Sequence, residues 1–586
     1  MLDVRLSVDI WSPKVLAIVA APVLAVAAWK VTGSLLRSYF VGKFTVMKDL
    51  PNVGKARPDD ERIRGTAVVC GGSIAGLWTA RICADHFEDV LIVEPEAWLA
   101  TEDGIAPVFD ENGDRIKLTP EHQRTRLHQV FGAHVFQILT LTVLRHLFPN
   151  FDEELLKRNG RIGPMEMNVY SSAGLLYRSP KIMYPNGNVP EMFFCSRDAY
   201  ERLLRHLVVE SSNRIRRMAG TAVGLKTDDM DVTSVKSVTV SPSDGSKTVD
   251  ISAALVVDCS GGTQAGFKWL KKIHSTLSEQ DTESTKLLNW DNLVNSYDIH
   301  GRWVSYDFFV PKALRSSLPI PGGYDNCKWL YSFIPFPGRE SKNFVIHRLE
   351  GHIIRFAFYG WGNPPLPSSA ENIREFIATV KCVEPAPQWL LDTIDLLLNE
   401  KDNVEVHTAA RPPAMNWIHY ERASYMPSNF VAIGDAVMRV NPSFGQGCTK
   451  ACVGAITLDS VLRSSNVAHK REIPKGFGAK FFKVHYNKVV DAWDGTKPMD
   501  YMFETTTPAK GERLEDEKVN GTLALTLFDM SITDLELDAL LVHVRQFVAP
   551  ATDVLAPWVL WRLLKFSLKR KLGIIKPFDP SACEHY

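Results

Sequence analysis

A glycine-rich turn between two apolar runs constrains the fold of this chain more than any other feature. The stretch from residue 68 to residue 94 reads VVCGGSIAGLWTARICADHFEDVLIVE, with an apolar run before the glycines and another at its end. Each run has the length of a buried strand, and the residues between them carry apolar side chains at helical spacing. The stretch therefore predicts a strand, a turn, a helix and a second, parallel strand. Parallel strands of this kind are normally covered by helices on both faces of the sheet.

The small residues of this turn are typical of dinucleotide binding. Gly71, Ser73 and Gly76 occupy the three special positions of a G-x-G-x-x-G turn, with serine in place of the middle glycine. Such a turn needs a glycine for its tight bend, a small residue where the backbone approaches a pyrophosphate, and a glycine for close helix–strand packing. Glu94 ends the second strand, where an acid accepts hydrogen bonds from an adenosine ribose. The unit predicts binding of FAD or NAD.

A second glycine-rich segment lies near residue 440. It reads IGDAVMRVNPSFGQGCTKA from residue 433 to residue 451, and it combines an acid, a proline and a Gly-Gln-Gly triplet. An ordinary turn needs only one or two such residues. The pattern predicts a strand, a shaped loop and a helix that begins directly after the glycines.

Five segments together resemble the FAD-dependent monooxygenases with the para-hydroxybenzoate hydroxylase type of fold. They are GGSIAGL, RTRLH at 124–128, CSRDAYERLLRHL at 195–207, VVDCSG at 256–261 and the segment 433–451. The resemblance implies an α/β fold: a Rossmann-like FAD-binding domain interleaved with a substrate domain built on an antiparallel sheet, then C-terminal helices. The expected bounds are 65–150, 195–285 and 426–465 for the FAD-binding domain, 151–194 and 286–425 for the substrate domain, and 466–586 for the helical region.

The same resemblance assigns cofactor roles to the segment near residue 440. Asp435 is expected to bind a ribityl hydroxyl of FAD, and Pro442 to lie beside the isoalloxazine ring. Gly445, Gln446 and Gly447 are expected to offer backbone N–H groups at a helix N-terminus to the pyrimidine edge of the ring, where negative charge accumulates on reduction.

Three further residues are implied by the resemblance. Arg126 and Arg197 are expected to contact the phosphate or ribityl region of FAD, and a salt bridge that caps a lobe is the alternative for either arginine. Asp258 lies where the family places an Asp-Gly pair, but this chain reads Asp-Cys-Ser-Gly there. Catalytic side chains are not identified, and no protein nucleophile is expected, because the cofactor supplies the oxidising power.

The activity that the resemblance implies uses FAD, NADPH or NADH as reductant, and O2. The expected reaction is hydroxylation or epoxidation of a lipophilic small molecule, in secondary-metabolite biosynthesis. Two alternatives stay open: a flavin-dependent reductase or desaturase of a prenyl-type substrate, and a non-catalytic flavin-fold escort protein.

Composition excludes other classes of partner. Lys+Arg and Asp+Glu each number 67, so no overall charge attracts nucleic acid, and we expect none to bind. The nine cysteines are scattered, without histidine or cysteine pairs at zinc spacing, so we predict no metal site.

The N-terminal segment predicts a membrane anchor. Val15–Trp29 is an uncharged apolar run bounded by Lys14 and Lys30. We expect a transmembrane anchor within residues 10–36, and a cleaved signal peptide is the alternative. Basic residues after the run place the catalytic domain on the cytoplasmic side of a single-pass membrane protein, in the endoplasmic reticulum.

Overall fold

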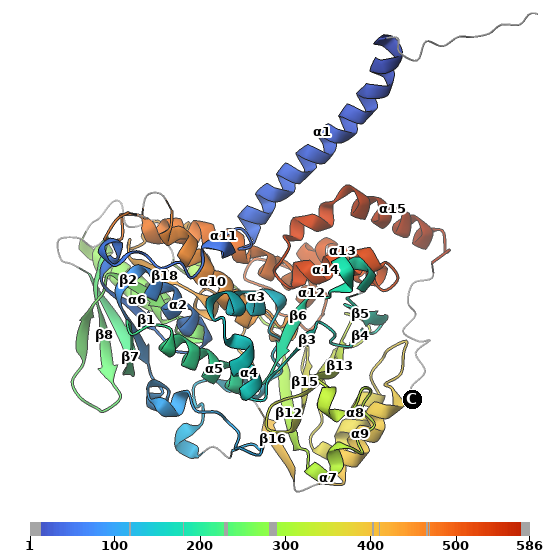
Figure 1. Ribbon diagram of the computed structural model, residues 1–586, viewed down its shortest axis with the longest axis horizontal. Coiled ribbons are helices and arrows are strands. Elements are labelled where there is room, and N and C mark those ends of the chain that lie inside the picture. Colours follow the sequence, from blue (N-terminus) through green and yellow to red (C-terminus); the bar gives the residue numbers. More distant parts are fainter. Residues whose placement is uncertain are drawn as a thin grey trace, which may run out of the picture.

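The computed structural model describes residues 13–116, 119–179, 181–227, 233–280, 290–400, 403–408, 411–464, 467 and 469–575. Figure 1 shows two sheet-containing lobes side by side, with one long helix standing out from the body. Each lobe is built from segments that lie far apart in the sequence.

A seven-stranded sheet forms the first lobe. The glycine-rich turn joins β1 (Ile63–Cys70) to α2 (Ile74–His86), which leads to the parallel β2 (Phe87–Glu94). The strand order is β18-β10-β1-β2-β7-β8-β9. The remaining strands are β7 (Ile215–Thr227), β8 (Val235–Pro242), β9 (Val249–Ser252), β10 (Leu255–Asp258) and β18 (Phe430–Ala432). The first five strands in that order are parallel, whereas β8 and β9 form an antiparallel extension.

Apolar side chains account for this parallel sheet. The last four residues of β1 and the last five of β2 are buried, as expected for strands covered on both faces. On one side, α2 packs against α5 (Arg197–Glu210) and α10 (Gly447–Leu462), and α10 packs against α11 (Phe477–Asp494). The predicted α/β architecture with a parallel sheet is therefore confirmed.

A second seven-stranded sheet forms the other lobe, with strand order β16-β12-β15-β14-β13-β4-β5. All its pairings are antiparallel except that between β13 and β4. Its strands are β4 (Val169–Ser171), β5 (Gly174–Leu176), β12 (Arg302–Phe309), β13 (Trp329–Ile334), β14 (Lys342–Arg348), β15 (Ile353–Gly360) and β16 (Val404–Thr408). Shorter strands are β3 (Arg161–Pro164), β6 (Glu191–Phe194), β11 (Val294–Tyr297), β17 (Met415–Ile418) and β19 (Met438–Arg439).

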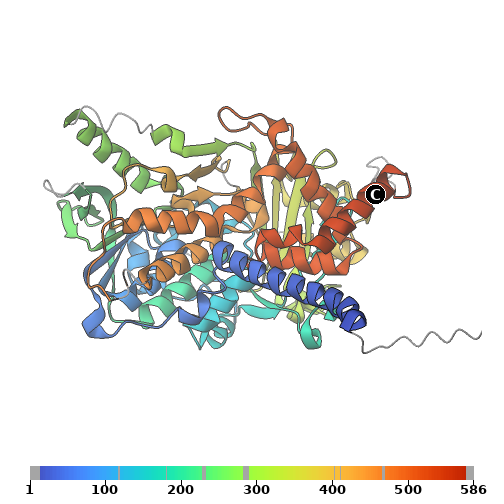
Figure 2. The same cartoon turned by 90° about the horizontal axis from the view of Figure 1, so that it is seen from above.

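Helices complete both lobes. They are α3 (Ile138–Leu147), α4 (Phe151–Lys157), α6 (Ala265–Gln280), α7 (Lys312–Arg315), α8 (Ile373–Ala378), α9 (Gln388–Leu398), α12 (Lys497–Tyr501), α13 (Lys518–Ser531), α14 (Leu535–Arg545) and α15 (Pro557–Lys571). Figure 2 shows the C-terminal helices beside the second sheet, so they close the end of that lobe.

The prediction of a transmembrane anchor is wrong. Most of the predicted segment 10–36 belongs to α1 (Pro13–Phe44), while residues 10–12 lie outside the described part of the chain. Over the residues that the structure describes, no helix combines the length and the apolar character needed to cross a membrane. The uncharged run between Lys14 and Lys30 is about 22 Å long as a helix, against a hydrocarbon core of about 30 Å. The single-pass topology and its membrane location, which rested on the same run, are wrong with it.

Candidate functional site

The turn after β1 has the close backbone packing that its glycines predict. Gly71 has a φ of +118°, in the region that favours glycine. A Cβ atom on Gly76 would lie 1.7 Å from the carbonyl oxygen of Gly71, so only glycine fits there. The backbone N–H of Gly72 donates to Oε2 of Glu94 over 2.8 Å. The end of β2 is thereby tied to the turn.

A buried charge cluster surrounds Ser73 at the N-terminus of α2. The Ser73 hydroxyl donates to Oε2 of Glu201 over 2.9 Å, and Nη2 of Arg197 donates to the Ser73 oxygen over 3.3 Å. Arg124 and Arg205 both contact the other oxygen of Glu201, in the case of Arg205 over 2.8 Å. Burial raises the pKa of Glu201, but the surrounding arginines, Arg124 foremost, outweigh that effect and lower it to about 2.

Arg124, rather than the predicted Arg126, reaches this cluster. Arg124 also pairs with Glu96, whereas the side chain of Arg126 is exposed and its backbone N–H donates to Glu96 over 3.0 Å. Glu94 is 4% exposed, and its Oε1 accepts from the Glu96 N–H over 2.9 Å. Burial raises the pKa of the Glu94 carboxyl.

The Gly434–Asp435 turn lies against the N-terminus of α2. Gly434 has a φ of +73°, and a Cβ there would lie 3.0 Å from the Cβ of Ala75. The Asp435 side chain is 32% exposed, and its Oδ1 accepts from Nζ of the buried Lys450 over 3.0 Å. Its other oxygen makes no hydrogen bond within the described residues. One face of the Asp435 carboxylate is therefore open to a ligand.

The segment after this turn presents the N-terminus of α10. Asn441 accepts from the N–H of Ser443 over 3.0 Å and so caps the short turn Pro442–Phe444. Gly445 follows with a φ of +65°, and α10 begins at Gly447. Pro442 and Gly447 are exposed. Gln446 is 8% exposed, and its Oε1 finds no partner in the described part of the chain.

The Cys448 thiol lies close enough to both turns for charged groups of each turn to affect its pKa. Burial raises the pKa of its thiol to about 11, against the opposing effect of Arg197. Asp435 and Glu201 both add to this rise, so the charges of both turns act on one side chain of α10. Because α2 and α10 also pack together, the two glycine-rich turns form one continuous site.

Asp258 is placed differently from these residues. It is fully buried, with Oδ1 accepting from the N–H of Ser260 over 2.9 Å and Oδ2 from the N–H of Gly266 over 2.8 Å. Burial raises the pKa of its carboxyl. Asp258 closes the loop between β10 and α6 and presents no exposed atom to a ligand.

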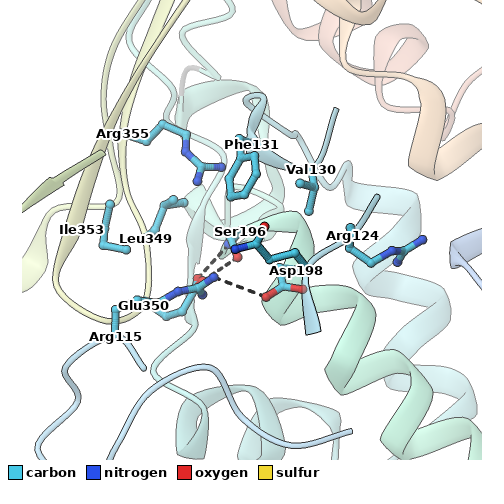
Figure 3. Close-up of a pocket in the computed structure, with 11 residues that line it drawn as sticks. Arg115, Arg124, Val130, Phe131, Ser196, Asp198, Leu349, Glu350, Ile353 and Arg355 are labelled. Atoms are coloured by element: carbon cyan, nitrogen blue, oxygen red, sulfur yellow. Dashed lines mark hydrogen bonds and ion pairs between the residues drawn. The ribbon is translucent and has the colours of Figure 1, made fainter. Parts of the chain in front are cut away.

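A pocket lined by both charged and apolar side chains lies between the α5 N-terminus and the second sheet (Figure 3). Figure 3 shows Arg115 beside the carboxylates of Asp198 and Glu350, at 3.4 and 3.6 Å. Glu350 also accepts from the Ser196 hydroxyl over 2.5 Å. Arg355, on the opposite wall, pairs with the buried Asp307 at 2.6 Å. Every charge of this pocket already has an opposite charge beside it.

A second, small pocket is almost entirely apolar. It shares Phe444 with the turn before α10, and its other lining residues are Leu176, Tyr177, Ile334, Pro335, Phe336, Trp361, Met499, Phe503, Phe528 and Arg545. Trp361 stacks on Phe503 with ring centroids 4.8 Å apart. The Trp361 indole N–H donates to Oδ1 of the buried Asp500 over 2.7 Å. The apolar pocket therefore adjoins the α10 end of the site.

Sequence reasoning missed Arg124, Glu201 and Arg205. Arg197, Glu201 and Arg205 follow one another at intervals of four residues in RDAYERLLR, which places them on one face of a helix. That spacing is the signal that could have identified the cluster.

The described residues fit FAD as a bound group. At the α2 N-terminus, the close backbone packing at Gly76 leaves room for glycine alone, and the guanidinium of Arg197 has few partners. At the second turn, one carboxylate oxygen of Asp435 is open to a ligand, and the N-terminus of α10 is exposed at Gly447. Helix N-termini favour the negative charge of phosphate groups. In the described part of the chain, no group of three or more His, Cys, Asp or Glu side chains could hold a metal ion.

Comparison with known proteins gives limited sequence similarity. No protein-family model matches the chain. Protein Rv3254 of Mycobacterium tuberculosis (strain ATCC 25618 / H37Rv) is 38% identical over 61 residues, which are 10% of this chain and 13% of that protein.

Several solved structures of flavin enzymes are similar to this chain. PqsL of P. aeruginosa, in complex with 2-aminobenzoylacetate, has 14% identity and a TM-score of 0.45, and the match covers 75% of this chain and 97% of PqsL. The p-nitrophenol 4-monooxygenase PnpA of Pseudomonas putida DLL-E4 has 16% identity and a TM-score of 0.47, covering 84% and 100%. The flavin-dependent brominase Bmp2 has 12% identity and a TM-score of 0.47, covering 87% and 100%. At these identities, the function of this chain has to be inferred from its own site residues.

Proposed function

We propose that this protein is an FAD-dependent monooxygenase that takes electrons from NADPH or NADH and transfers one oxygen atom of O2 to a lipophilic small molecule. The observation that carries the proposal is the packing of the Gly71–Gly76 turn against the Gly434–Asp435 turn, with the exposed α10 N-terminus beside them. FAD, when bound, supplies the redox chemistry, and the chain supplies binding, orientation and exclusion of water.

The α2 N-terminus is the proposed pyrophosphate site. Its backbone N–H groups favour negative charge, and the small side chain of Ser73 lets a phosphate approach. Arg197 donates one hydrogen bond to Ser73 and lies 3.8 Å from Glu201, so donors of its guanidinium remain for a phosphate oxygen. Glu94 is the proposed ribose acceptor, since a carboxylate has about four acceptor positions and two are used by backbone N–H groups.

The other turn is proposed to hold the ribityl chain and the ring. The open oxygen of Asp435 can accept from a ribityl hydroxyl, while Lys450 holds the opposite oxygen and fixes the carboxylate. The N-terminus of α10 at Gly445–Gly447 would face the pyrimidine edge, because helix N–H groups stabilise charge that develops there. The unpaired Gln446 oxygen can accept from a ring N–H.

The apolar pocket beyond Phe444 supports a lipophilic substrate. Its lining is aromatic and aliphatic apart from Arg545 and backbone groups, and such a wall keeps water away from reactive groups. A hydroxylation or epoxidation step in secondary-metabolite biosynthesis would use a substrate of this kind.

The test is the absorption spectrum of the purified protein before and after addition of NADPH under air. We expect a bound flavin band that bleaches with NADPH and returns as O2 is consumed. Product formation in the strict absence of O2 would contradict the monooxygenase and support a reductase. A protein that purifies without flavin, and whose melting temperature FAD does not raise, would support an escort protein.

A further inference from the structure

A fully buried carboxylate lies directly behind the turn that precedes α10. Asp500, on α12, is 0% exposed and accepts hydrogen bonds from three side chains. Nδ2 of Asn441 donates to its Oδ1 over 2.6 Å, the indole N–H of Trp361 donates to the same oxygen over 2.7 Å, and the hydroxyl of Tyr297 donates to its Oδ2 over 2.8 Å. Three parts of the chain that lie far apart in the sequence therefore meet at this one side chain.

All three donors to this carboxylate are uncharged. Asp500 forms no ion pair with any residue that the structure describes, and Lys497 on the same helix pairs instead with Glu512 and Glu517, at 2.7 and 3.2 Å. Burying an acid without a cation costs free energy unless hydrogen bonds compensate for the lost water. A carboxylate has about four acceptor positions, so this one side chain can hold all three donors at once.

Asn441 connects Asp500 to the turn. Asn441 is also 0% exposed, and both polar atoms of its side chain are used: Nδ2 donates to Asp500, and Oδ1 accepts from the backbone N–H of Ser443 over 3.0 Å. The turn therefore has a buried side, which rests on Asp500 through Asn441, and an exposed side at Pro442 and Gly447. The exposed side is the one that the proposed flavin site uses.

We infer that Asp500 is a positioning residue of the proposed flavin site: through Asn441 its carboxylate holds the turn Pro442–Phe444, and with it the N-terminus of α10, in the position that binds FAD. The inference rests on the proposed function, because the turn has this role only in a chain that binds FAD. Binding groups are held close to their productive geometry by hydrogen bonds behind them, and a buried network whose members are all satisfied is rigid. Asp500 acts through Asn441 and is not itself a catalytic residue.

The bond to Trp361 extends the same support to the second lobe. Trp361 directly follows β15, stacks on Phe503 and lines the small apolar pocket together with Phe444. Because the Trp361 indole and the Asn441 amide donate to the same oxygen of Asp500, the pocket wall and the turn are held in a fixed relation to each other.

The test measures FAD affinity and the free energy of unfolding for variants of the full-length apoprotein. Asp500→Ala and Asn441→Ser each remove the bond between these two side chains, while serine keeps an oxygen that can cap the turn. We expect each variant to bind FAD about tenfold more weakly or worse. The double variant should bind FAD no more weakly than Asp500→Ala, within about threefold, because both changes remove the same bond.

Asp500→Asn is the conservative variant and should restore FAD affinity to within about threefold of the wild type. Its side-chain oxygen can accept from Asn441 and Trp361, while its amide can donate to the Tyr297 oxygen. Loss of FAD affinity in Asp500→Asn as large as in Asp500→Ala would overturn the inference.

Tyr297→Phe is the matched control, because it removes a bond to the same carboxylate without changing a contact of the turn. It should lower the free energy of unfolding and leave FAD affinity within about threefold of the wild type. Unchanged FAD affinity in Asn441→Ser, or equal losses in Asn441→Ser and Tyr297→Phe, would overturn the inference. If Asp500→Ala does not fold, these two variants carry the comparison. A wild-type protein that binds no FAD would contradict the proposed function itself, and the inference with it.

Discussion

Asn441 donates from Nδ2 to Oδ1 of Asp500 over 2.6 Å, while its side-chain oxygen Oδ1 accepts from the N–H of Ser443 and caps the turn Pro442–Phe444. The same carboxylate accepts from the Tyr297 hydroxyl over 2.8 Å and from the Trp361 indole over 2.7 Å. One fully buried acid thus joins β11, the wall of the apolar pocket and the turn before α10. Its protonation state should affect all three.

Asp500 should make stability depend on pH between about 4 and 7. Burial raises the pKa of Asp500 to about 7 from 3.8, although its three hydrogen-bond donors oppose the shift. The folded protein therefore binds a proton more tightly than the unfolded chain, so this contribution is present below pH 4 and is lost as pH rises to 7. We expect the free energy of unfolding of the wild type to fall by roughly 4 kcal/mol more than that of Asp500→Asn over this interval. Urea unfolding at a series of pH values measures these free energies. If they depend on pH in the same way in the wild type and in Asp500→Asn, the predicted role of Asp500 is wrong.

Glu201 should make the opposite contribution at acid pH. Its folded pKa of about 2 lies below the unfolded value of 4.5. Its stabilisation is thus present above pH 4.5 and is lost as pH falls towards 2. Because Glu201→Gln leaves buried arginines without their acidic partner, we expect the free energy of unfolding at pH 7 to fall by about 3 to 5 kcal/mol. The exposed Glu153, paired with Lys157, is the matched control. Glu153→Gln should unfold as the wild type does, and equal behaviour of the two variants would contradict the role of the cluster.

Gly76→Ala should remove both stability and flavin. The added Cβ would lie 1.7 Å from the Gly71 carbonyl oxygen, so the strand and helix must separate. We expect the free energy of unfolding to fall by about 3 kcal/mol or more, and we expect the variant to retain no FAD. Gly224→Ala in β7 is the control, because a Cβ there meets nothing within 4 Å. Flavin content after gel filtration is the measurement, and normal flavin in Gly76→Ala would refute the pyrophosphate placement.

Asp435→Ala should weaken FAD binding by roughly 1 to 3 kcal/mol through the lost ribityl hydrogen bond. It also removes the acidic partner of Lys450, which is 1% exposed and keeps only the Met438 carbonyl oxygen as an acceptor, so stability should fall as well. The double variant Asp435→Ala/Lys450→Met separates the two effects. It should recover stability but not FAD affinity, as measured by thermal unfolding of the apoprotein and by flavin titration. Recovery of both would show that Asp435 acts only through Lys450.

The parallel sheet could be predicted because its signals are local. The strand, turn, helix and strand from β1 to β2 lie within one short stretch, and the glycine positions follow from steric requirements that hold in any fold. The α10 N-terminus could be predicted for the same reason, since glycine and helical spacing meet within one segment.

The charge cluster could not be predicted with the same precision. Arg124 and Arg126 both lie in RTRLH, and only the packing of that loop against Glu96 and Glu201 decides which side chain turns inward. The apolar pocket draws residues from β5, β13, α12, α13 and α14, so no single stretch of sequence contains it. The anchor prediction failed because a short apolar run was extended with flanking residues that include Lys30.

The contact between α2 and α10 has a consequence for biosynthesis. The ribosome releases the N-terminal residues of the chain first, and Gly71–Gly76 emerges long before Gly434 and α10. Until Gly434 and α10 have been synthesised, Ala75 in the first glycine-rich turn lacks its contact with Gly434. Nascent chains that end before residue 447 should therefore be unable to retain the cofactor. Its capture is expected to be a late event, after most of both lobes has been synthesised.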